Sequence, residues 1–413
     1  MEKQQSKKPL IRFPEFNEPW DHKRLNELLS EAKKRNEDLK YGKDQVLSVS
    51  GELGIVNQIE HLGRSYAGVS VHQYHVVEVG DIVYTKSPLK ANPFGIIKLN
   101  KGKVGIVSTL YAVYKVKNQS AYGPFIDYYF SLDANTNRYL RPLVRKGAKN
   151  TLQVTNEEAI SAEIFTPTIP EQIRIASFFT VLDKKITELK QKKNLLEQYK
   201  KGVTQKIFSQ ELRFKDDNDR NFPEWKKIKI TQIAETSIGL VTTMTTSYVE
   251  FGVPLIRNSD IKENRIEKSQ LIYLDETFAT KHKHKKLKTG DIVTVHTGLI
   301  GVSAVIDETM NGCLGFATLN TRVNRDLVIP EFICIYYNTP TYINYAISVA
   351  TGDGRSNYNL KDFDKAIIPV PSLKEQVKIL NFLNNIDFKL NNCRLQIEQI
   401  KLFKKGLLQN MFI

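Results

Sequence analysis

Two histidines stand close together in the run KHKHKKLK, residues 281–288, and this spacing raises the question of a metal site. A transition-metal site needs further His, Cys or carboxylate ligands at matching spacing, and the run offers none beside His282 and His284. The run is therefore interpreted as a basic loop, either solvated or in contact with phosphate. We predict no metal site in this chain.

The triplet Asn92-Pro93-Phe94 is the nearest approach to a catalytic motif. Amino-methyltransferases use an Asn/Asp-Pro-Pro-aromatic loop with a glycine-rich cofactor turn, but here the second proline is missing and no GxGxxG follows a strand. Nothing matches the phosphate-binding pattern GxxxxGK[ST] either. Asn92-Pro93 is interpreted as a turn, and we predict no catalytic residue and no cofactor bound by this chain. A methyltransferase or nuclease acting alone stays open as an alternative.

Charge favours binding over catalysis. The 413 residues contain 60 Lys and Arg against 45 Asp and Glu, which leaves a net charge of +15. Such an excess is typical of proteins that meet a polyanion, most often nucleic acid. The alternative is charge that serves solubility alone.

Five loops combine the side chains that contact phosphates with those that read base edges. They are YTKSPLKANPF (84–94), RKGAKNTLQ (145–153), KHKHKK (281–286), VHTGLIG (295–301) and TGDGRSNYN (351–359). Each loop taken singly could also be a solvated turn. The candidate DNA-binding residues are Lys86, Lys90, Asn92, Arg145, Lys146, Lys149, Lys283, Lys285, His296, Thr297, Arg355, Ser356 and Asn357.

An internal repeat organises the elements that must hold these loops. EQYKKGVTQKIF (197–208) returns as KLFKKGLLQNMF (401–412), 204 residues downstream. At this offset Lys200, Lys201, Gly202, Gln205 and Phe208 become Lys404, Lys405, Gly406, Gln409 and Phe412, and Pro167, Glu171, Gln172, Ile175, Phe178, Asp183 and Lys185 become Pro371, Glu375, Gln376, Ile379, Phe382, Asp387 and Lys389.

The earlier parts of the two halves correspond more loosely. RFPEFNEPW (12–20) echoes NFPEW (221–225), and GDIV (80–83) recurs at 290–293. Between these anchors the halves differ, so the sequence predicts a variable globule followed by a preserved helix, twice over.

Each preserved helix begins after a proline and a Ser/Thr, in TPTIPEQ and VPSLKEQ. Both carry a long apolar stripe at three- and four-residue steps, which indicates that each needs an apolar partner. At 1.5 Å per residue, a helix of ~38 residues is roughly 57 Å long. Because the second helix begins near the end of the first, we predict an antiparallel pair. The alternative is two helices that each dock on their own globule.

The predicted fold class is α+β: two mixed α/β domains in tandem, separated by two long antiparallel coiled-coil helices, with an internal pseudo-twofold repeat. Expected strands include HVVEVGDIVYT, KVGIVSTLYAVYKV, KTGDIVTVHT and GVSAVI, and expected short helices are YGPFIDYYFSL and IPEFICIYYNTP. The predicted domains are 1–168 and 213–372 for the globules, with helices at 169–212 and 373–413.

At this point the sequence resembles a known family. GDGRSNYNLKDFDKAIIPVPSLKEQ (352–376), followed by a helix ending in FKKGLLQNMF, is similar to the specificity subunit of type I restriction–modification enzymes. The first half repeats the pattern as GAKNTLQVTNEEAISAEIFTPTIPEQ (147–172) and YKKGVTQKIF, so the resemblance covers the whole chain. It departs at one point: the first half has Asn150-Thr151-Leu152-Gln153 where the second has Gly354-Arg355-Ser356-Asn357.

The resemblance implies that each globule is a target recognition domain that reads one half of a bipartite double-stranded DNA target. Divergence of the globules predicts an asymmetric target. The helices would set the gap between half-sites and dock two modification subunits, which bind S-adenosylmethionine and methylate adenine at N6. Restriction subunits, which translocate and cut DNA with ATP and magnesium, would join them. The chain itself would not be catalytic; a nucleic-acid-binding coiled-coil scaffold is a further alternative.

For subunit docking, the resemblance singles out the repeated helix ends, namely Lys200, Lys201, Gly202, Gln205, Lys404, Lys405, Gly406 and Gln409. A glycine inside a helix costs up to ~1 kcal/mol relative to alanine. Its presence at both positions indicates close packing, either between the two helices or with a partner.

A cytoplasmic location is expected. Cys313, Cys334 and Cys393 are scattered and form no CxxC pair, so neither a disulfide framework nor a cysteine zinc site is predicted. The first residues contain no apolar stretch typical of a signal peptide, and no run approaches the ~20 apolar residues needed to span a bilayer.

Overall fold

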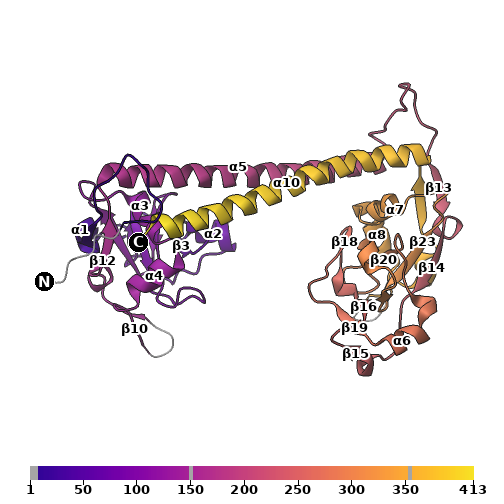
Figure 1. Ribbon diagram of the computed structural model, residues 1–413, viewed down its shortest axis with the longest axis horizontal. Helices are drawn as coiled ribbons and strands as arrows, with labels where there is room; N and C mark the ends of the chain where they lie inside the picture. The colour runs from indigo at the N-terminus through magenta and orange to yellow at the C-terminus, as the bar shows by residue number, and fades with distance from the viewer. Residues whose placement is uncertain (1–7, 148–151, 352–355) are drawn as a thin grey trace. The chain divides into compact units, whose positions relative to one another are not determined.

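The computed structural model describes residues 8–147, 152–351 and 356–413. The chain forms two compact units: residues 1–191 with 394–413, called unit 1, and residues 192–393, called unit 2. Helix α5 (Ile169–Phe208) begins in unit 1 and ends in unit 2, and helix α10 (Leu373–Met411) does the reverse (Figure 1). Each unit therefore combines one globule with the start of one long helix and the end of the other.

Unit 1 is built on a four-stranded antiparallel sheet in the order β2-β9-β6-β7. Two-stranded pairs β1-β12, β3-β4, β5-β8 and β10-β11 surround it. The strands are β1 Asp21–Arg24, β2 Leu29–Glu31, β3 Leu47–Ser50, β4 Gly54–Asn57, β5 His75–Val77, β6 Ile82–Thr85, β7 Ile96–Leu99, β8 Gly105–Val107, β9 Tyr111–Val116, β10 Arg145–Lys146, β11 Leu152–Gln153 and β12 Glu163–Thr166; the α-helices of the globule are α1 Leu25–Leu28, α2 Gln58–Leu62, α3 Gly123–Tyr129 and α4 Asp133–Leu140.

Unit 2 contains two four-stranded sheets, β14-β23-β20-β21 and β15-β19-β16-β22, and the pairs β13-β24 and β17-β18. The strands are β13 Lys226–Lys229, β14 Ala234–Ile238, β15 Tyr248–Val249, β16 Val253–Ile256, β17 Ile261–Lys262, β18 Arg265–Ile266, β19 Ile272–Leu274, β20 Ile292–Thr294, β21 Ser303–Val305, β22 Leu314–Gly315, β23 Leu319–Val323 and β24 Ile367–Val370; the α-helices are α6 Glu276–Lys281, α7 Pro330–Tyr337, α8 Pro340–Val349 and α9 Leu360–Phe363. The expected strands and the two expected short helices, now α3 and α7, are confirmed.

The apolar stripe of the long helices is buried inside each unit. In unit 1, Phe179 of α5 stacks near Phe412, just past the end of α10, with ring centroids 6.1 Å apart, and both join the globule core beneath α3. Further along, Ile186 and Leu189 of α5 cluster with Ile397 of α10. Contacts that run down one helix and up the other show that these helix segments are antiparallel, as predicted.

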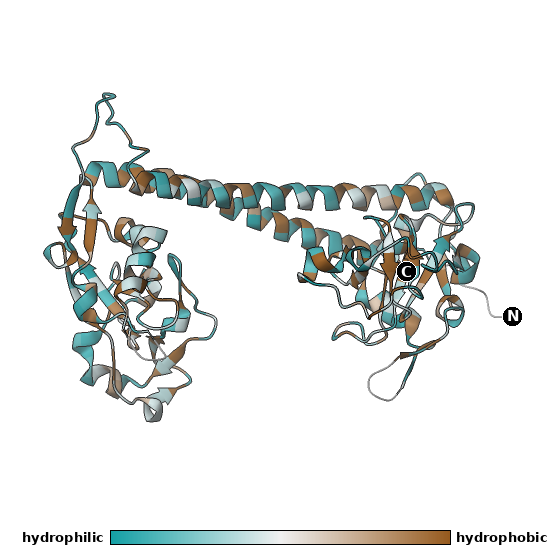
Figure 2. Cartoon of the chain, turned by 180° about the vertical axis from the view of Figure 1, so that it is seen from behind, coloured by the Kyte–Doolittle hydropathy of each residue, from teal (hydrophilic) through white to brown (hydrophobic). Residues whose placement is uncertain are grey.

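Unit 2 repeats this packing with the roles of the helices exchanged. Val203 and Ile207 from the end of α5 share a core with Leu380 and Leu383 from the start of α10. In Figure 2 both helices alternate brown apolar residues with teal polar ones along their length. The stripe is thus covered partly by the other helix and partly by a globule, so elements of both predicted arrangements are present within a unit.

A buried Glu-Gln pair near the start of each long helix ties it to its globule. Glu171 is 1% exposed and receives two hydrogen bonds of 2.7 Å from the Arg12 guanidinium, while Gln172 accepts the backbone N–H of Tyr122 just before α3. In unit 2, Arg213 bonds Glu375 in the same way. This explains why Glu-Gln recurs at the 204-residue offset.

Within the described residues, no helix is long and apolar enough to cross a membrane.

Candidate nucleic-acid interface and helix surface

The GDIV repeat forms the same turn in both units, ahead of strands β6 and β20. Its glycines have φ of +93° and +90°, a left-handed conformation that a side chain disfavours. The aspartate that follows pairs with a basic residue on the adjacent strand of the same sheet. Asp81 lies 2.8 Å from Lys115 of β9, and Asp291 lies 2.6 Å from Arg322 of β23. Because the turn is fixed in the same way twice, the two hairpins that follow start from equivalent positions.

In unit 2 the hairpin loop brings two predicted binding loops together. The loop between β20 and β21 spans residues 295–302. Thr297 in this loop donates a 2.7 Å hydrogen bond from Oγ1 to Oδ1 of Asn357. His296 Nδ1 lies 2.8 Å from the same hydroxyl, and its carbonyl accepts the N–H of Tyr358. The VHTGLIG loop and residues 356–359, the described end of the TGDGRSNYN segment, therefore lie together although more than fifty residues separate them in sequence.

His296 contributes to this surface as a neutral group. Partial burial lowers its pKa, because water no longer stabilises the charged ring. At neutral pH the imidazole therefore acts as a hydrogen-bonding group rather than as a cation.

Unit 1 joins the corresponding segments with different chemistry. The loop between β6 and β7 spans residues 86–95, and Lys86 Nζ donates a 2.7 Å hydrogen bond to Asn156 Oδ1, just beyond the RKGAKNTLQ segment. Lys146 of β10 lies with its Nζ 5.9 Å from the ring centroid of Phe94. Burial lowers the pKa of Lys86. The same two segments meet as in unit 2, but here both contacts use a lysine.

Asn92 has a different position from the one expected of a DNA contact. It is only 5% exposed, and its side-chain amide donates a 2.7 Å hydrogen bond to Asp133 of α4. Its backbone exchanges two hydrogen bonds with Leu89. In this conformation Asn92 shapes the loop and does not reach the surface; the expected turn at Asn92-Pro93 is present.

The remaining candidates divide by exposure. Lys285 is committed to the structure, since its Nζ donates a 2.7 Å hydrogen bond to the carbonyl of Ile238 at the end of β14. Lys149 and Arg355 lie outside the described residues. The candidates with exposed side chains are Lys90, Arg145, Lys146, Lys283 and Ser356.

Two of the predicted docking residues on the long helices have partners within their own unit. Lys404 pairs with Asp183 in unit 1 and Lys200 pairs with Asp387 in unit 2. The exposed docking candidates are Lys201, Gln205, Lys405 and Gln409. Lys200 and Lys404 therefore hold the helices together, a contact for which the separate sequences of the two helices gave no signal.

The helix glycines do not pack tightly within the chain. A Cβ built on Gly202 or Gly406 would meet no atom of the described residues within 4 Å. The expectation of close packing between the helices is thus wrong, because the apolar stripe that joins them lies on another face. Packing against a partner stays a prediction.

Sequence reasoning missed an exposed aromatic residue three positions before each of these glycines. Tyr199 is 54% exposed and Phe403 is 56% exposed, and the two are related by the 204-residue offset. The signal was available in EQYKKG and KLFKKG, because both copies keep an aromatic residue at this position. Each helix end thus presents an aromatic side chain beside an open glycine.

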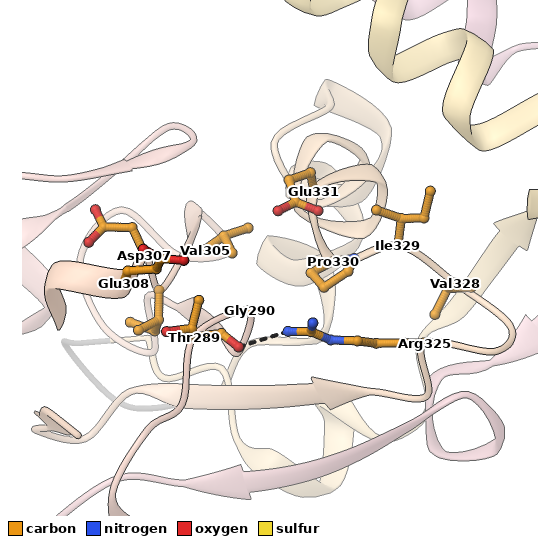
Figure 3. Close-up of a pocket in the computed structure, with 11 residues that line it drawn as sticks. Thr289, Gly290, Val305, Asp307, Glu308, Arg325, Val328, Ile329, Pro330 and Glu331 are labelled. Atoms are coloured by element: carbon orange, nitrogen blue, oxygen red, sulfur yellow. Dashed lines mark hydrogen bonds between the residues drawn. The ribbon is translucent and has the colours of Figure 1, made fainter. Parts of the chain in front are cut away.

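A cavity of about 490 Å³ lies at the other end of the unit 2 hairpin, beside the GDIV turn (Figure 3). Arg325 reaches into its wall and donates a 2.8 Å hydrogen bond to the carbonyl of Thr289, drawn as the dashed line. Asp307, also in the wall, is engaged by Lys268 at 2.6 Å. None of the residues that line this cavity lies in the loop at 295–302 or in residues 356–359, so the cavity is separate from the loop surface.

In the described part of the chain, no three His, Cys, Asp or Glu side chains gather as a metal site would require. His282 and His284 lie with ring centroids 6.3 Å apart. All three cysteines are free and buried.

Two α/β units with equivalent loop surfaces and shared long helices define a class of tandem-repeat recognition proteins. The family model for the type I restriction modification DNA specificity domain matches residues 17–198 and 223–401, and the chain belongs to this family. The predicted family and the predicted fold class are thus confirmed.

Curated relatives carry the same description. The chain is 23% identical over 159 residues to the type I restriction enzyme EcoBI specificity subunit of Escherichia coli, covering 37% of this chain and 34% of the relative. It is 25% identical over 259 residues to the MjaVIII specificity subunit of Methanocaldococcus jannaschii, covering 59% of each. These alignments span less than two thirds of the relatives' lengths.

Solved structures share the fold along nearly the whole chain. An S subunit of a type I restriction–modification system from M. genitalium superimposes with a TM-score of 0.55 at 14% identity, covering 98% of this chain and 99% of that one. A chain from a study of complex assembly and conformational transition of the type I R-M system gives 0.58 at 16% identity, covering 95% and 97%.

Proposed function

We propose that this chain is the DNA-recognition subunit of a type I restriction–modification complex, in which each unit reads one half of an asymmetric, bipartite duplex target. The long helices set the gap between the half-sites. The excess of basic residues supplies a sequence-independent, salt-sensitive attraction to the phosphate backbone, and the loop surfaces discriminate between base pairs.

One observation carries this proposal: the same two segments contact each other in both units, but the side chains that make the contacts differ. In both units the hairpin after GDIV contacts the segment that precedes a long helix. In unit 1 the contacts use Lys86 and Lys146, whereas in unit 2 they use His296, Thr297 and Asn357. Equivalent positions with different hydrogen-bonding groups support two readers for two different half-sites.

The helix ends support docking of two copies of one partner. Each presents an aromatic residue, Tyr199 or Phe403, next to a glycine with free space around it. A large exposed ring beside a notch suits the ridge of a partner helix, and its repetition favours two identical partners. The exposed Lys201 and Lys405 close by favour an acidic rim on that partner. We propose modification subunits that methylate adenine at N6 as these partners.

Catalysis and cofactors belong to the partners in this proposal. The chain acts as a non-catalytic subunit in the cytoplasm; S-adenosylmethionine binds to the modification subunits, and ATP with magnesium to the restriction subunits. Incubation of the purified chain with S-adenosylmethionine and DNA is expected to give no methyl transfer. Transfer without a partner would favour an enzyme acting alone.

Methylation mapping tests the central claim. Long-read sequencing of DNA from cells that express the chain with its modification and restriction subunits is expected to show methylated adenines in a bipartite motif with unlike halves. A symmetric or contiguous motif would contradict the proposal. Competition between mapped duplex, scrambled duplex and RNA separates DNA recognition from a general nucleic-acid scaffold, because only the first predicts preference for the mapped duplex.

A further inference from the structure

One apolar residue occupies the same place in both hairpin loops. Leu89 follows the glycine of the first GDIV turn by nine positions, and Leu299 follows the second by nine positions. Leu89 is 43% exposed and Leu299 is 67% exposed. A single exposed leucine needs no explanation, but retention of one at an equivalent tip, where the neighbouring residues have diverged, calls for a shared role.

The residues before each leucine share their burial although they differ in type. In Lys-Ser-Pro-Leu (86–89) and in His-Thr-Gly-Leu (296–299), the first two residues are half-buried and the last two are exposed. The first two residues of each set face the adjoining loop, as the bonds of Lys86 and Thr297 show. The tip that carries the leucine is therefore presented in the same way on both units.

The unit 2 tip is held firmly from both sides. Ile300, next to the leucine, is 7% exposed and belongs to the unit core. Gly301 has φ of +85° and packs so closely on α8 that an added Cβ would lie 3.0 Å from Ile343 Cδ1. The carbonyl of Leu299 also accepts the N–H of Val302 at 3.2 Å. The leucine projects from an ordered loop.

The unit 1 tip is ordered by different bonds. The N–H of Leu89 donates to the carbonyl of Asn92 at 3.0 Å, and the N–H of Asn92 donates back at 3.1 Å. Asn137 of α4 further bonds the carbonyl of Ala91. Two different sets of supports hold a leucine at one position, which indicates that the side chain itself matters.

We propose that Leu89 and Leu299 are specificity-determining residues, each packing against the 5-methyl group of a thymine in the major groove of its half-site. The inference rests on the proposed function and adds to it the base that each tip recognises. A leucine side chain neither donates nor accepts hydrogen bonds, so among base-edge groups only the thymine methyl matches its chemistry. Polar groups beside it, such as Thr297, are left to read donors and acceptors.

The test uses the full chain with its modification subunits and duplexes that carry the mapped motif. Deoxyuridine replaces each thymine in turn, which removes only the methyl group. For one position in each half-site, wild-type binding is expected to weaken about fourfold, the loss typical of one buried methyl-sized group. The Leu299→Ala complex is expected to bind the thymine duplex more weakly than wild type by the same factor. Replacing that thymine with deoxyuridine should then cause no further loss of affinity. Leu89→Ala is expected to behave in the same way in the other half-site.

Matched variants control for general effects. Leu327→Ala, 45% exposed next to the cavity wall at the far end of the hairpin, is expected to keep the wild-type response to deoxyuridine. Leu62→Ala, 47% exposed on α2, serves unit 1. Leu299→Met retains an apolar side chain and is expected to restore most of the discrimination.

The outcomes separate this inference from the proposed function. If the wild-type complex does not prefer the mapped duplex over scrambled DNA, the proposed function fails. If it does prefer the mapped duplex, but thymine and deoxyuridine bind equally, or both leucine variants respond to deoxyuridine as wild type does, the leucine contact fails alone. Half-sites without thymine on either strand would also overturn it.

Discussion

Lys404 Nζ lies 2.5 Å from Asp183 Oδ1 in unit 1, and this pair joins the end of α10 to the first half of α5. In unit 2, Lys200 Nζ lies 2.6 Å from Asp387, joining the end of α5 to the first half of α10. Adding the 204-residue offset to Asp183 gives Asp387, and adding it to Lys200 gives Lys404. Each copy of the duplicated helix thus carries both the aspartate and the lysine. In unit 1 the aspartate comes from α5 and the lysine from α10, and in unit 2 the reverse holds, so both pairs join antiparallel segments.

Removal of the two lysines is expected to have unequal effects. Asp183 also accepts a 2.8 Å hydrogen bond from the Tyr128 hydroxyl, and Lys404 lies 5.0 Å from the centroid of the Tyr128 ring. Asp387 is half exposed. Lys404→Met should therefore lower the free energy of unfolding by about 1 kcal/mol and Lys200→Met by a few tenths of a kcal/mol, as measured by urea denaturation.

An exchange variant controls for the loss of a side chain. Asp183→Lys combined with Lys404→Asp is expected to regain part of the stability that each single change removes, because the pair is rebuilt with reversed charge. Equal losses for the two methionine variants, or no recovery in the exchange variant, would contradict the asymmetry.

The Lys404 pair also shows where sequence reasoning stops. Repetition of Asp183, Lys200 and their equivalents was visible in the sequence, and so were the helices, the antiparallel order and the GDIV strands. The pairing of each aspartate with its lysine was not visible, because the two residues are more than 180 positions apart and each has other charged residues beside it. Lys200 and Lys404 were therefore predicted only as docking residues, and their ion pairs within the chain were not foreseen.

Burial was the second property that the sequence concealed. Asn92 has the type expected of a base contact, but α4 comes to lie against its loop and engages its amide. Conversely, Leu89 and Leu299 have the type expected of a core and lie on the surface. Local sequence fixed the turn in both hairpins, whereas the side of the turn that faces solvent depended on segments distant in the chain.

The two ion pairs between a buried glutamate and an arginine, Arg12–Glu171 and Arg213–Glu375, are expected to stabilise the fold strongly. Glu375 is fully buried and its partner Arg213 also pairs with Glu224, which is 89% exposed. Glu375→Gln removes the fully buried counter-charge of a guanidinium that is only 21% exposed and leaves it paired with Glu224 alone, so it should lower the free energy of unfolding by about 2 kcal/mol. Glu224→Gln removes a partner of the same arginine and should cost well under 1 kcal/mol.

Thermal unfolding of these two variants measures the difference. Glu171→Gln in unit 1 is expected to resemble Glu375→Gln, because Glu171 is 1% exposed and bonds Arg12 twice. Similar melting temperatures for Glu375→Gln and Glu224→Gln would show that burial of the ion pair adds nothing.

His75 is expected to make unit 1 sensitive to acid. Burial in strand β5 lowers its pKa to about 4 from an ordinary value of 6.5. Between these values the unfolded chain binds more protons than the folded one, so stability from the neutral imidazole is present above pH 6.5 and is lost as the pH falls toward 4. At pH 5 the loss from this residue amounts to about 2 kcal/mol.

Denaturation at pH 7 and pH 5 tests this titration. His75→Leu removes the ionisable group and should reduce the difference in unfolding free energy between the two pH values, whatever its effect at pH 7. His61→Gln changes an exposed histidine in the same unit and serves as the control. An unchanged pH dependence in His75→Leu would mean that other groups cause the acid sensitivity.

Stoichiometry offers the sharpest test of the two docking surfaces. If Tyr199 and Phe403 each anchor one modification subunit, Tyr199→Ala or Phe403→Ala should weaken one of two equivalent contacts by at least 2 kcal/mol, about thirtyfold. Native mass spectrometry of the co-expressed complex is then expected to show two partner copies on the wild-type chain, one on each single variant and none on the double variant. Phe388→Ala removes an aromatic residue that is 66% exposed on α10 but corresponds to Lys184 at the 204-residue offset, so two copies should remain. Loss of both copies from a single variant would show that the helices form one joint surface rather than two repeated ones.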